Sequence, residues 1–210
     1  MKRALPVCAV ILALAATCLA APPDGYRRIE SVAASVNGEV IFLSDVEREA
    51  CFYRCGTVPG QAPREVTPSR AREMLIADTL VLQEQKKLGL GTVDNAALAA
   101  EEADALSRTR NCASPCAAAV TVAEIHELVQ RRLLVRDFLE RRVAVFIEVN
   151  DEEVRREIAQ RDRSGSPPEE RTEVKVRTDL LREKGASEIR NWFSRATSKS
   201  RITLSPLSEP

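Results

Sequence analysis

Residues 34–47 read Ala-Ser-Val-Asn-Gly-Glu-Val-Ile-Phe-Leu-Ser-Asp-Val-Glu, and this stretch decides how the fold begins. Apolar positions alternate with others on both sides of Asn37-Gly38, a dipeptide favoured in two-residue hairpin turns. The turn predicts three cross-strand pairs, which are Val36 with Glu39, Ala34 with Ile41, and Val32 with Leu43. Because a lone hairpin is marginal in water, we expect it to pack on helices or to gain a third strand.

Capping signals divide the rest of the chain into helices. Ser44 with Glu47 predicts a helix start directly after the hairpin. Thr67-Pro68 begins a strongly apolar helix that stops at Gly89 and is expected to be the central, buried one. Further helices are predicted over 93–108, 121–142 and 150–161, and on either side of Gly185, with a terminal strand at 202–204. The sequence therefore predicts a mainly α fold with a small sheet formed by the hairpin and the terminal strand.

The first twenty residues have the parts of a secretory signal peptide in the right order. Lys2 and Arg3 precede an apolar run at 7–14, which is too short to span a bilayer core of roughly 30 Å. Cleavage after Ala20 leaves small side chains, Cys18 and Ala20, at the positions before the cut. A retained anchor and a lipoprotein attached through Cys18 are the alternatives. The leader predicts that the protein is exported.

The charge of the chain is nearly balanced. The leader contains two of the 31 Lys and Arg residues and none of the 31 Asp and Glu residues, so the mature chain carries a net charge of −2. This balance gives no reason to expect nucleic acid or an anionic membrane surface as a partner. No later stretch is apolar enough to cross a membrane, so no transmembrane segment is predicted in the mature chain.

Four cysteines remain after the leader, arranged as two Cys-x3-Cys pairs: Cys51 with Cys55, and Cys112 with Cys116. An even number in an exported chain favours disulfides. A zinc site and a redox-active pair are the alternatives, but both usually use a Cys-x2-Cys spacing.

Three disulfide connectivities are open to four cysteines. A bond between Cys51 and Cys55 is awkward if both are helical, because the Cβ vectors of residues i and i+4 are not aimed at each other. Two antiparallel segments joined first to fourth and second to third suit the twin motif better. We therefore favour Cys51–Cys116 and Cys55–Cys112.

The sequence offers no catalytic constellation. His126 is the only histidine, and no serine has a suitable histidine partner, so a hydrolytic triad is not expected. Paired arginines such as Arg131-Arg132 are interleaved with acidic residues, which argues against a nucleic-acid surface. Trp192-Phe193 is interpreted as an anchor for the last helix, or alternatively as a contact for an extended client chain. No catalytic residue, metal ligand or cofactor is predicted.

Several motifs spread over nearly the whole mature chain carry a family resemblance. They lie at 36–41 (VNGEVI), 44–46 (SDV), 80–84 (LVLQE), 87–90 (KLGL), 132–139 (RLLVRDFL), 149–154 (VNDEEV) and 189–193 (IRNWF). In this order they resemble the SurA-type periplasmic chaperones, specifically their N-terminal domain with the short C-terminal helix and strand that complete it. The resemblance implies a periplasmic, non-enzymatic module that binds extended or unfolded envelope polypeptides in an apolar groove between helices.

The chain departs from that family in its two Cys-x3-Cys pairs, in its shortened segment 111–121, and most clearly between the core and the terminal helix. There the family carries one or two parvulin-type prolyl isomerase domains, whereas this chain has a linker at 164–172 that contains Ser-Gly-Ser-Pro-Pro. The predicted layout is a leader (1–20), a SurA-like core (21–163), the linker, and a C-terminal helical segment with a strand (173–210) that completes the core. An enzyme is not expected. A dedicated interaction subunit of an envelope complex and a degenerate prolyl isomerase are the alternative functions, and the client-binding residues are left unassigned.

Overall fold

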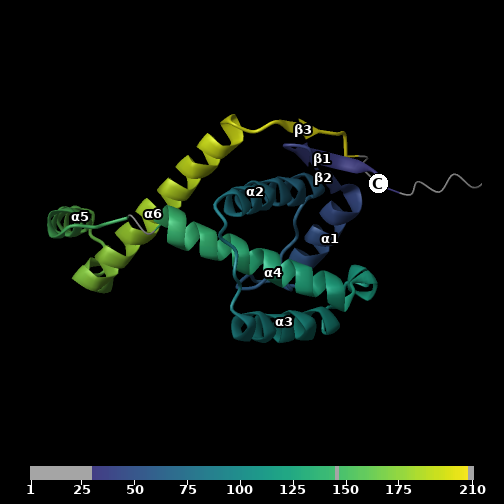
Figure 1. Ribbon diagram of the computed structural model, residues 1–210. Helices are drawn as coiled ribbons and strands as arrows, with labels where there is room; N and C mark the ends of the chain where they lie inside the picture. The colour runs from purple at the N-terminus through teal and green to yellow at the C-terminus, as the bar shows by residue number, and fades with distance from the viewer. Residues whose placement is uncertain (1–29, 145–146, 208–210) are drawn as a thin grey trace, which may run out of the picture.

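The computed structural model describes residues 30–144 and 147–207, and the leader predicted at 1–20 lies outside these ranges. The described chain contains the helices α1 (Leu43–Arg54), α2 (Pro68–Lys87), α3 (Asn95–Arg110), α4 (Val122–Phe138), α5 (Asp151–Arg163) and α6 (Glu173–Ser198). Shorter helical turns are η2 (Pro115–Ala119), η3 (Leu139–Ala144) and η4 (Pro168–Arg171). The strands β1 (Val32–Val36), β2 (Glu39–Phe42) and β3 (Ile202–Leu204) form one sheet, so the fold is mainly α with a small sheet, as predicted (Figure 1).

The hairpin gains its third strand from the other end of the chain. The sheet has the order β2-β1-β3, and both neighbours of β1 run antiparallel to it. Asn37 and Gly38 take positive φ angles of 54° and 92°, which fits the tight two-residue turn expected from this dipeptide. The Asn37 side chain also accepts a hydrogen bond of 2.9 Å from the backbone N–H of Arg201, directly before β3. The turn therefore joins the two ends of the described chain.

A bulge changes the register at the start of the hairpin. Val36 lies opposite Glu39 and Ala34 opposite Ile41, as predicted, but Val32 lies opposite Phe42 and not Leu43. The register shifts between Val32 and Ala34 because Ala33 is an extra residue in β1. Val32, at the edge of this bulge, is 45% exposed.

Helix α1 begins earlier than its sequence signal indicates. Its N-cap is Phe42, whose backbone N–H donates to the Asp45 carboxylate at 2.9 Å, so the predicted Ser44–Glu47 capping box does not form. The Ser44 hydroxyl instead donates to the Glu30 carboxylate at 2.8 Å. Asp45 accepts from the backbone N–H of the N-cap residue Phe42, in the way that Glu47 was expected to accept from that of Ser44. The strand therefore passes directly into the helix.

The core lies between the sheet and the helices α1, α2 and α4. Its fully buried members include Val36 of β1, Val46 of α1, and Leu128 and Val129 of α4. Helix α3 buries only Ala105 and Thr109, and it lies on the outer side of α4 (Figure 1). Helix α3 therefore lies outside the core.

Helix α6 is one continuous helix. The sequence predicted a break at Gly185, but α6 runs through it from Glu173 to Ser198. A glycine inside a helix costs only about 1 kcal/mol relative to alanine, and the neighbouring residues favour a helix. The N-terminal half of α6 packs with α5 to form an arm at the side of the body, and the C-terminal end leads into β3 (Figure 1).

The segment 164–172 should be the first site of proteolysis between residues 30 and 207. It connects α5 to α6, and Arg163 before it is exposed, whereas Arg161 and Arg171 are held by hydrogen bonds to Glu170 and Asp162. We expect brief trypsin treatment to cut after Arg163, the exposed last residue of α5, before any arginine further inside a helix. Mass spectrometry identifies the cut. The two fragments should co-elute on gel filtration, because β3 still pairs with β1; a first cut inside a helix contradicts the proposed layout.

Candidate functional site

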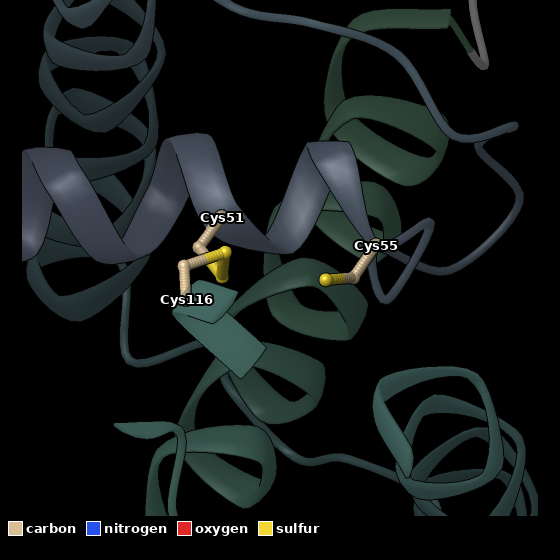
Figure 2. A group of neighbouring side chains, drawn as sticks. All are labelled: Cys51, Cys55 and Cys116. Atoms are coloured by element: carbon tan, nitrogen blue, oxygen red, sulfur yellow. A yellow bond between two sulfur atoms is a disulfide. The ribbon is translucent and has the colours of Figure 1, made fainter. Parts of the chain in front are cut away.

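Two disulfides join α1 to the segment between α3 and α4. Cys51 is bonded to Cys116 with a Cα–Cα distance of 6.0 Å, and Cys55 to Cys112 with a Cα–Cα distance of 5.2 Å. This is the connectivity that the twin motif favours. Figure 2 shows the side chains of Cys51, Cys55 and Cys116 gathered on one side of α1. The pair of bonds fixes α1 to η2, which leads into α4.

Four charged side chains meet between α1, α2 and α4, and we call them the ionic cluster: Glu49, Asp78, Arg131 and Arg132. Glu49 is 1% exposed, and its carboxylate pairs with both arginines, with Arg131 Nη2 at 2.6 Å from Oε2. Asp78 is 5% exposed, and its Oδ2 lies 2.9 Å from Arg132 Nη1 and 3.2 Å from Arg131 Nε. The two cations and two anions balance each other, so the cluster has no net charge when all four are ionised.

The sequence did not reveal the ionic cluster, although one signal was present. Val46, Glu49, Ala50 and Tyr53 follow the i, i+3, i+4, i+7 spacing of one helix face, and all four are buried. Glu49 therefore occupies an apolar stripe, where a carboxylate requires a partner. That partner is the Arg131-Arg132 pair, whose interleaving with acidic residues argues in the sequence only against a nucleic-acid surface.

Asp78 should titrate well above its ordinary range. Burial raises the pKa of this carboxyl from 3.8 to about 6, with Arg132 and Arg131 acting in the lowering direction and Glu49 in the raising direction. Between about pH 4 and pH 6 the folded protein then holds a proton that the unfolded chain has released. The stabilisation associated with Asp78 is therefore complete below about pH 4, and it is lost as the pH rises through about 6.

Two measurements check this titration. The carboxyl carbon of Asp78, followed by NMR, should shift with a midpoint near pH 6. The unfolding free energy of the wild type relative to Asp78→Asn should fall with rising pH in this window, by up to about 1.4 kcal/mol per unit. The Asn variant is the matched control, because its neutral amide resembles the protonated acid at every pH. A midpoint at or below pH 4 contradicts the expected shift.

The C-terminal half of α6 contacts the body along a narrow seam. Trp192 packs on Phe138 of α4 with ring centroids 5.3 Å apart, and on Phe193 at 4.9 Å, in edge-to-face arrangements. Val81 of α2 and Ile189 of α6 belong to the same apolar cluster. Trp192 was interpreted as an anchor or as a client contact. It packs as an anchor against α2 and α4, and it remains partly exposed.

A groove of about 650 Å³ opens beside this seam, between α6, α2 and the hairpin turn. We call it the Trp192 groove. Its apolar residues are Leu80, Trp192 and Ala196. Charged and polar side chains make up the rest of its lining, namely Asn37, Glu39, Gln83, Glu84, Lys86, Lys87, Arg195, Lys199 and Ser200. The groove thus combines an apolar strip with a rim that contains four cations and two anions.

A second groove, of about 350 Å³, lies on the part of the seam formed by α4. We call it the Tyr53 groove. It is more apolar, and its lining includes Tyr53, Val58, Val135, Leu139 and Ile189. Arg132 of the ionic cluster also lines it, with its guanidinium carbon 5.7 Å from the centre of the Tyr53 ring. The ionic cluster therefore contributes one of its side chains to the lining of this groove.

The remaining sequence candidates are not brought into a reactive arrangement. His126 joins α4 to α3 through Glu102, with Nδ1 at 3.3 Å from the carboxylate, and its side chain is 45% exposed. Among the described residues, one group of potential metal ligands gathers, formed by Cys51, Cys55 and Cys116. In this structure their sulfurs are engaged in disulfides.

In comparisons with known proteins, the chain matches no protein-family model and no curated protein. Within the described ranges, no helix combines the length and the apolar character needed to cross a bilayer.

Proposed function

We propose that this protein is a non-enzymatic, chaperone-like module of the periplasm that binds extended or unfolded segments of envelope polypeptides. The observation that carries the proposal is the Trp192 groove, where a partly exposed tryptophan and other apolar side chains lie beside a helix that touches the body along one seam. The two disulfides support an exported location. The SurA-like order of motifs supports the same function.

The composition of the groove suits an unfolded chain more than a small ligand. An extended segment can place apolar side chains on Leu80, Trp192 and Ala196, while its backbone and polar side chains reach the charged rim. Burial of apolar surface contributes about 25 cal/mol per Å², and ordering the flexible client offsets part of it. Micromolar, rapidly exchanging binding is therefore expected, without a nucleotide to drive release.

The proposed function is tested by aggregation of an unfolded outer-membrane protein, followed by light scattering after dilution from urea. A several-fold molar excess of the purified protein should suppress the scattering. Trp192 is the only tryptophan of the chain, so its fluorescence reports binding of a tryptophan-free client peptide directly. Unchanged aggregation together with unchanged fluorescence contradicts the proposal.

Ala196→Glu should lower client affinity by about tenfold or more, whereas Thr197→Glu should leave it within about twofold. Ala196 lines the groove beside Trp192, so a glutamate there fills the apolar strip and places a charge where client side chains would bind. Thr197 is the next residue of α6 and is exposed outside the groove, so it controls for the added charge and for any effect on the helix end. Fluorescence titration gives both affinities, and equal losses would exclude the groove as the binding site.

Exposed apolar side chains on the arm formed by α5 and α6 favour the alternative of a dedicated interaction subunit. Val174 is 78% exposed and Leu181 41% exposed on the part of α6 that packs with α5. Such a subunit would bind one folded partner at a fixed stoichiometry and would not respond to generic unfolded peptides. Pull-down from envelope extract separates the two functions. A proline-limited refolding assay tests the remaining alternative, a degenerate isomerase, which requires an increased refolding rate.

A further inference from the structure

The four disulfide cysteines are gathered more closely than two independent bonds require. The Sγ atoms of Cys51, Cys55 and Cys116 all lie within 4.8 Å of one another, although Cys55 is bonded to the fourth cysteine, Cys112. Both disulfides therefore form a single cluster of four sulfurs. In Figure 2 the Cys55 sulfur lies on the same side of α1 as the Cys51–Cys116 bond.

We propose that the reduced protein binds one Zn²⁺ ion through the four thiolates of Cys51, Cys55, Cys112 and Cys116. Structural zinc sites are tetrahedral and often use four cysteines at about 2.3 Å, which places neighbouring sulfurs about 3.8 Å apart. The gathered sulfurs can reach this spacing by side-chain rotation once the two S–S bonds are broken. The inference does not depend on the proposed chaperone function.

The Cys-x3-Cys spacing argues against a zinc knuckle, which usually has a Cys-x2-Cys spacing, but it does not argue against zinc ligands on a helix. Cys51 is in α1 and Cys55 is its C-cap, so the pair sits one helical turn apart on one face. Two histidines at the same i, i+4 spacing hold zinc on a helix in metalloproteases. The second pair comes from the turn after α3 and from η2, which face α1 across the cluster. The two segments together supply the four ligands.

The surroundings of the cluster give access to it and support a thiolate. A hollow of about 550 Å³ is lined by Cys55 and Cys112, with Arg54 and Arg108 beside them. A reductant or an ion can reach the second disulfide through this hollow. The Ser114 Oγ lies 3.2 Å from the Cys116 sulfur, where its hydroxyl can donate to a thiolate. Arg54 and Arg108 are each paired with a carboxylate, of Glu65 and Asp104, and are not counted as ligands or counter-ions.

The oxidised protein is converted to the zinc-bound protein in two steps, reduction and metal binding. Each disulfide takes up two electrons and two protons from one dithiol reductant, which becomes a cyclic disulfide. Binding of Zn²⁺ then releases four protons from the four thiols and leaves a tetrathiolate centre with a net charge of −2. Oxidation by a disulfide donor reverses the first step and expels the ion. In either state α1 remains joined to η2. The cross-link changes from two disulfides to a zinc centre, and its position in the fold stays the same.

The test uses the purified protein, reduced under anaerobic conditions and freed of metal, with Co²⁺ as a spectroscopic probe. We expect the charge-transfer and d–d bands of a tetrahedral cobalt tetrathiolate, saturating at one equivalent and removed by one equivalent of Zn²⁺. The melting temperature of the reduced protein should rise with zinc, and the oxidised protein should show neither effect. Absence of these bands in the reduced wild type overturns the proposal.

Cys112→Ser tests the fourth ligand, which is bonded to Cys55 but is not among the three residues whose sulfurs all lie within 4.8 Å of one another. Zinc affinity should fall by more than the roughly 10- to 100-fold that loss of an outer-shell partner costs. Unchanged affinity in this variant also overturns the proposed four-thiolate site. If the reduced variant loses its helical circular dichroism, the intensity of the charge-transfer band in the wild type decides instead, because it scales with the number of bound thiolates. An intensity below that of four thiolates then counts against the proposal.

Discussion

Replacing Glu49 by alanine should lower the free energy of unfolding by about 3–5 kcal/mol, because it leaves buried cations without their partner. Glu49 contacts both Arg131 and Arg132, and it is 1% exposed. After its removal only Asp78 remains to balance two guanidiniums that are largely withdrawn from water. Urea unfolding of wild type and variant, followed by circular dichroism, measures the difference.

Glu47→Ala is the matched control for this substitution. Glu47 lies two residues earlier on α1 and is exposed, so its removal should change the unfolding free energy by no more than about 0.5 kcal/mol. The same residue type on the same helix thus separates loss of the ion pairs from loss of helix propensity. A cost below about 1 kcal/mol for Glu49→Ala would show that water reaches the cluster and replaces the lost carboxylate.

Local signals in the sequence predicted most of the elements of this fold. The Asn37-Gly38 turn, the Thr67-Pro68 helix start and the helix start at Thr121 each depend on neighbours in the chain, and each occurs in the structure where it was expected. The exceptions are places where contacts with residues distant in the sequence determine the local structure. The bulge at Ala33 and the early start of α1 at Phe42 depend on how the hairpin meets the helices, which no local pattern contains.

The candidate site was less predictable than the fold. Glu49 and Asp78 come from different helices, and their partners lie more than fifty positions further along the chain. The Trp192 groove likewise forms only because α6 returns to the body after the arm and places Trp192 beside Leu80. Trp192 itself was predictable as a large apolar anchor. Its partly exposed position depends on the packing of three separate segments.

The two disulfides differ from these features, because the twin spacing already favoured, among three open connectivities, the one that the structure shows. Both bonds cross-link the same pair of segments, with sequence separations of 65 and 57 residues, and the shorter loop lies inside the longer one. The stabilities of the two bonds are therefore coupled. Either bond alone holds α1 near η2, and the second bond then closes only the short segments between the two cross-links.

Removing one disulfide by paired alanine substitution should cost about 3 kcal/mol, and removing both should cost about 7 kcal/mol. Loop-closure entropy gives about 4 kcal/mol for the first bond, whose loop has the full separation of 57 or 65 residues. The second bond closes a ring of roughly ten residues and adds only about 3 kcal/mol. The variants are Cys51→Ala with Cys116→Ala, Cys55→Ala with Cys112→Ala, and all four together.

Urea unfolding of the oxidised proteins distinguishes this pattern from bonds within each Cys-x3-Cys pair. Bonds within each Cys-x3-Cys pair would close rings of about five residues, worth about 2 kcal/mol each and simply additive, because such rings share no chain. The nested bonds instead predict that the double removal costs more than the sum of the single removals. An additive total near 4 kcal/mol, together with a Cys51–Cys55 linked peptide in a non-reducing digest, would contradict the nested staple. A total that exceeds the sum shows that each bond supports α1 in the absence of the other, which is also the condition for four sulfurs to stay gathered when one bond is opened.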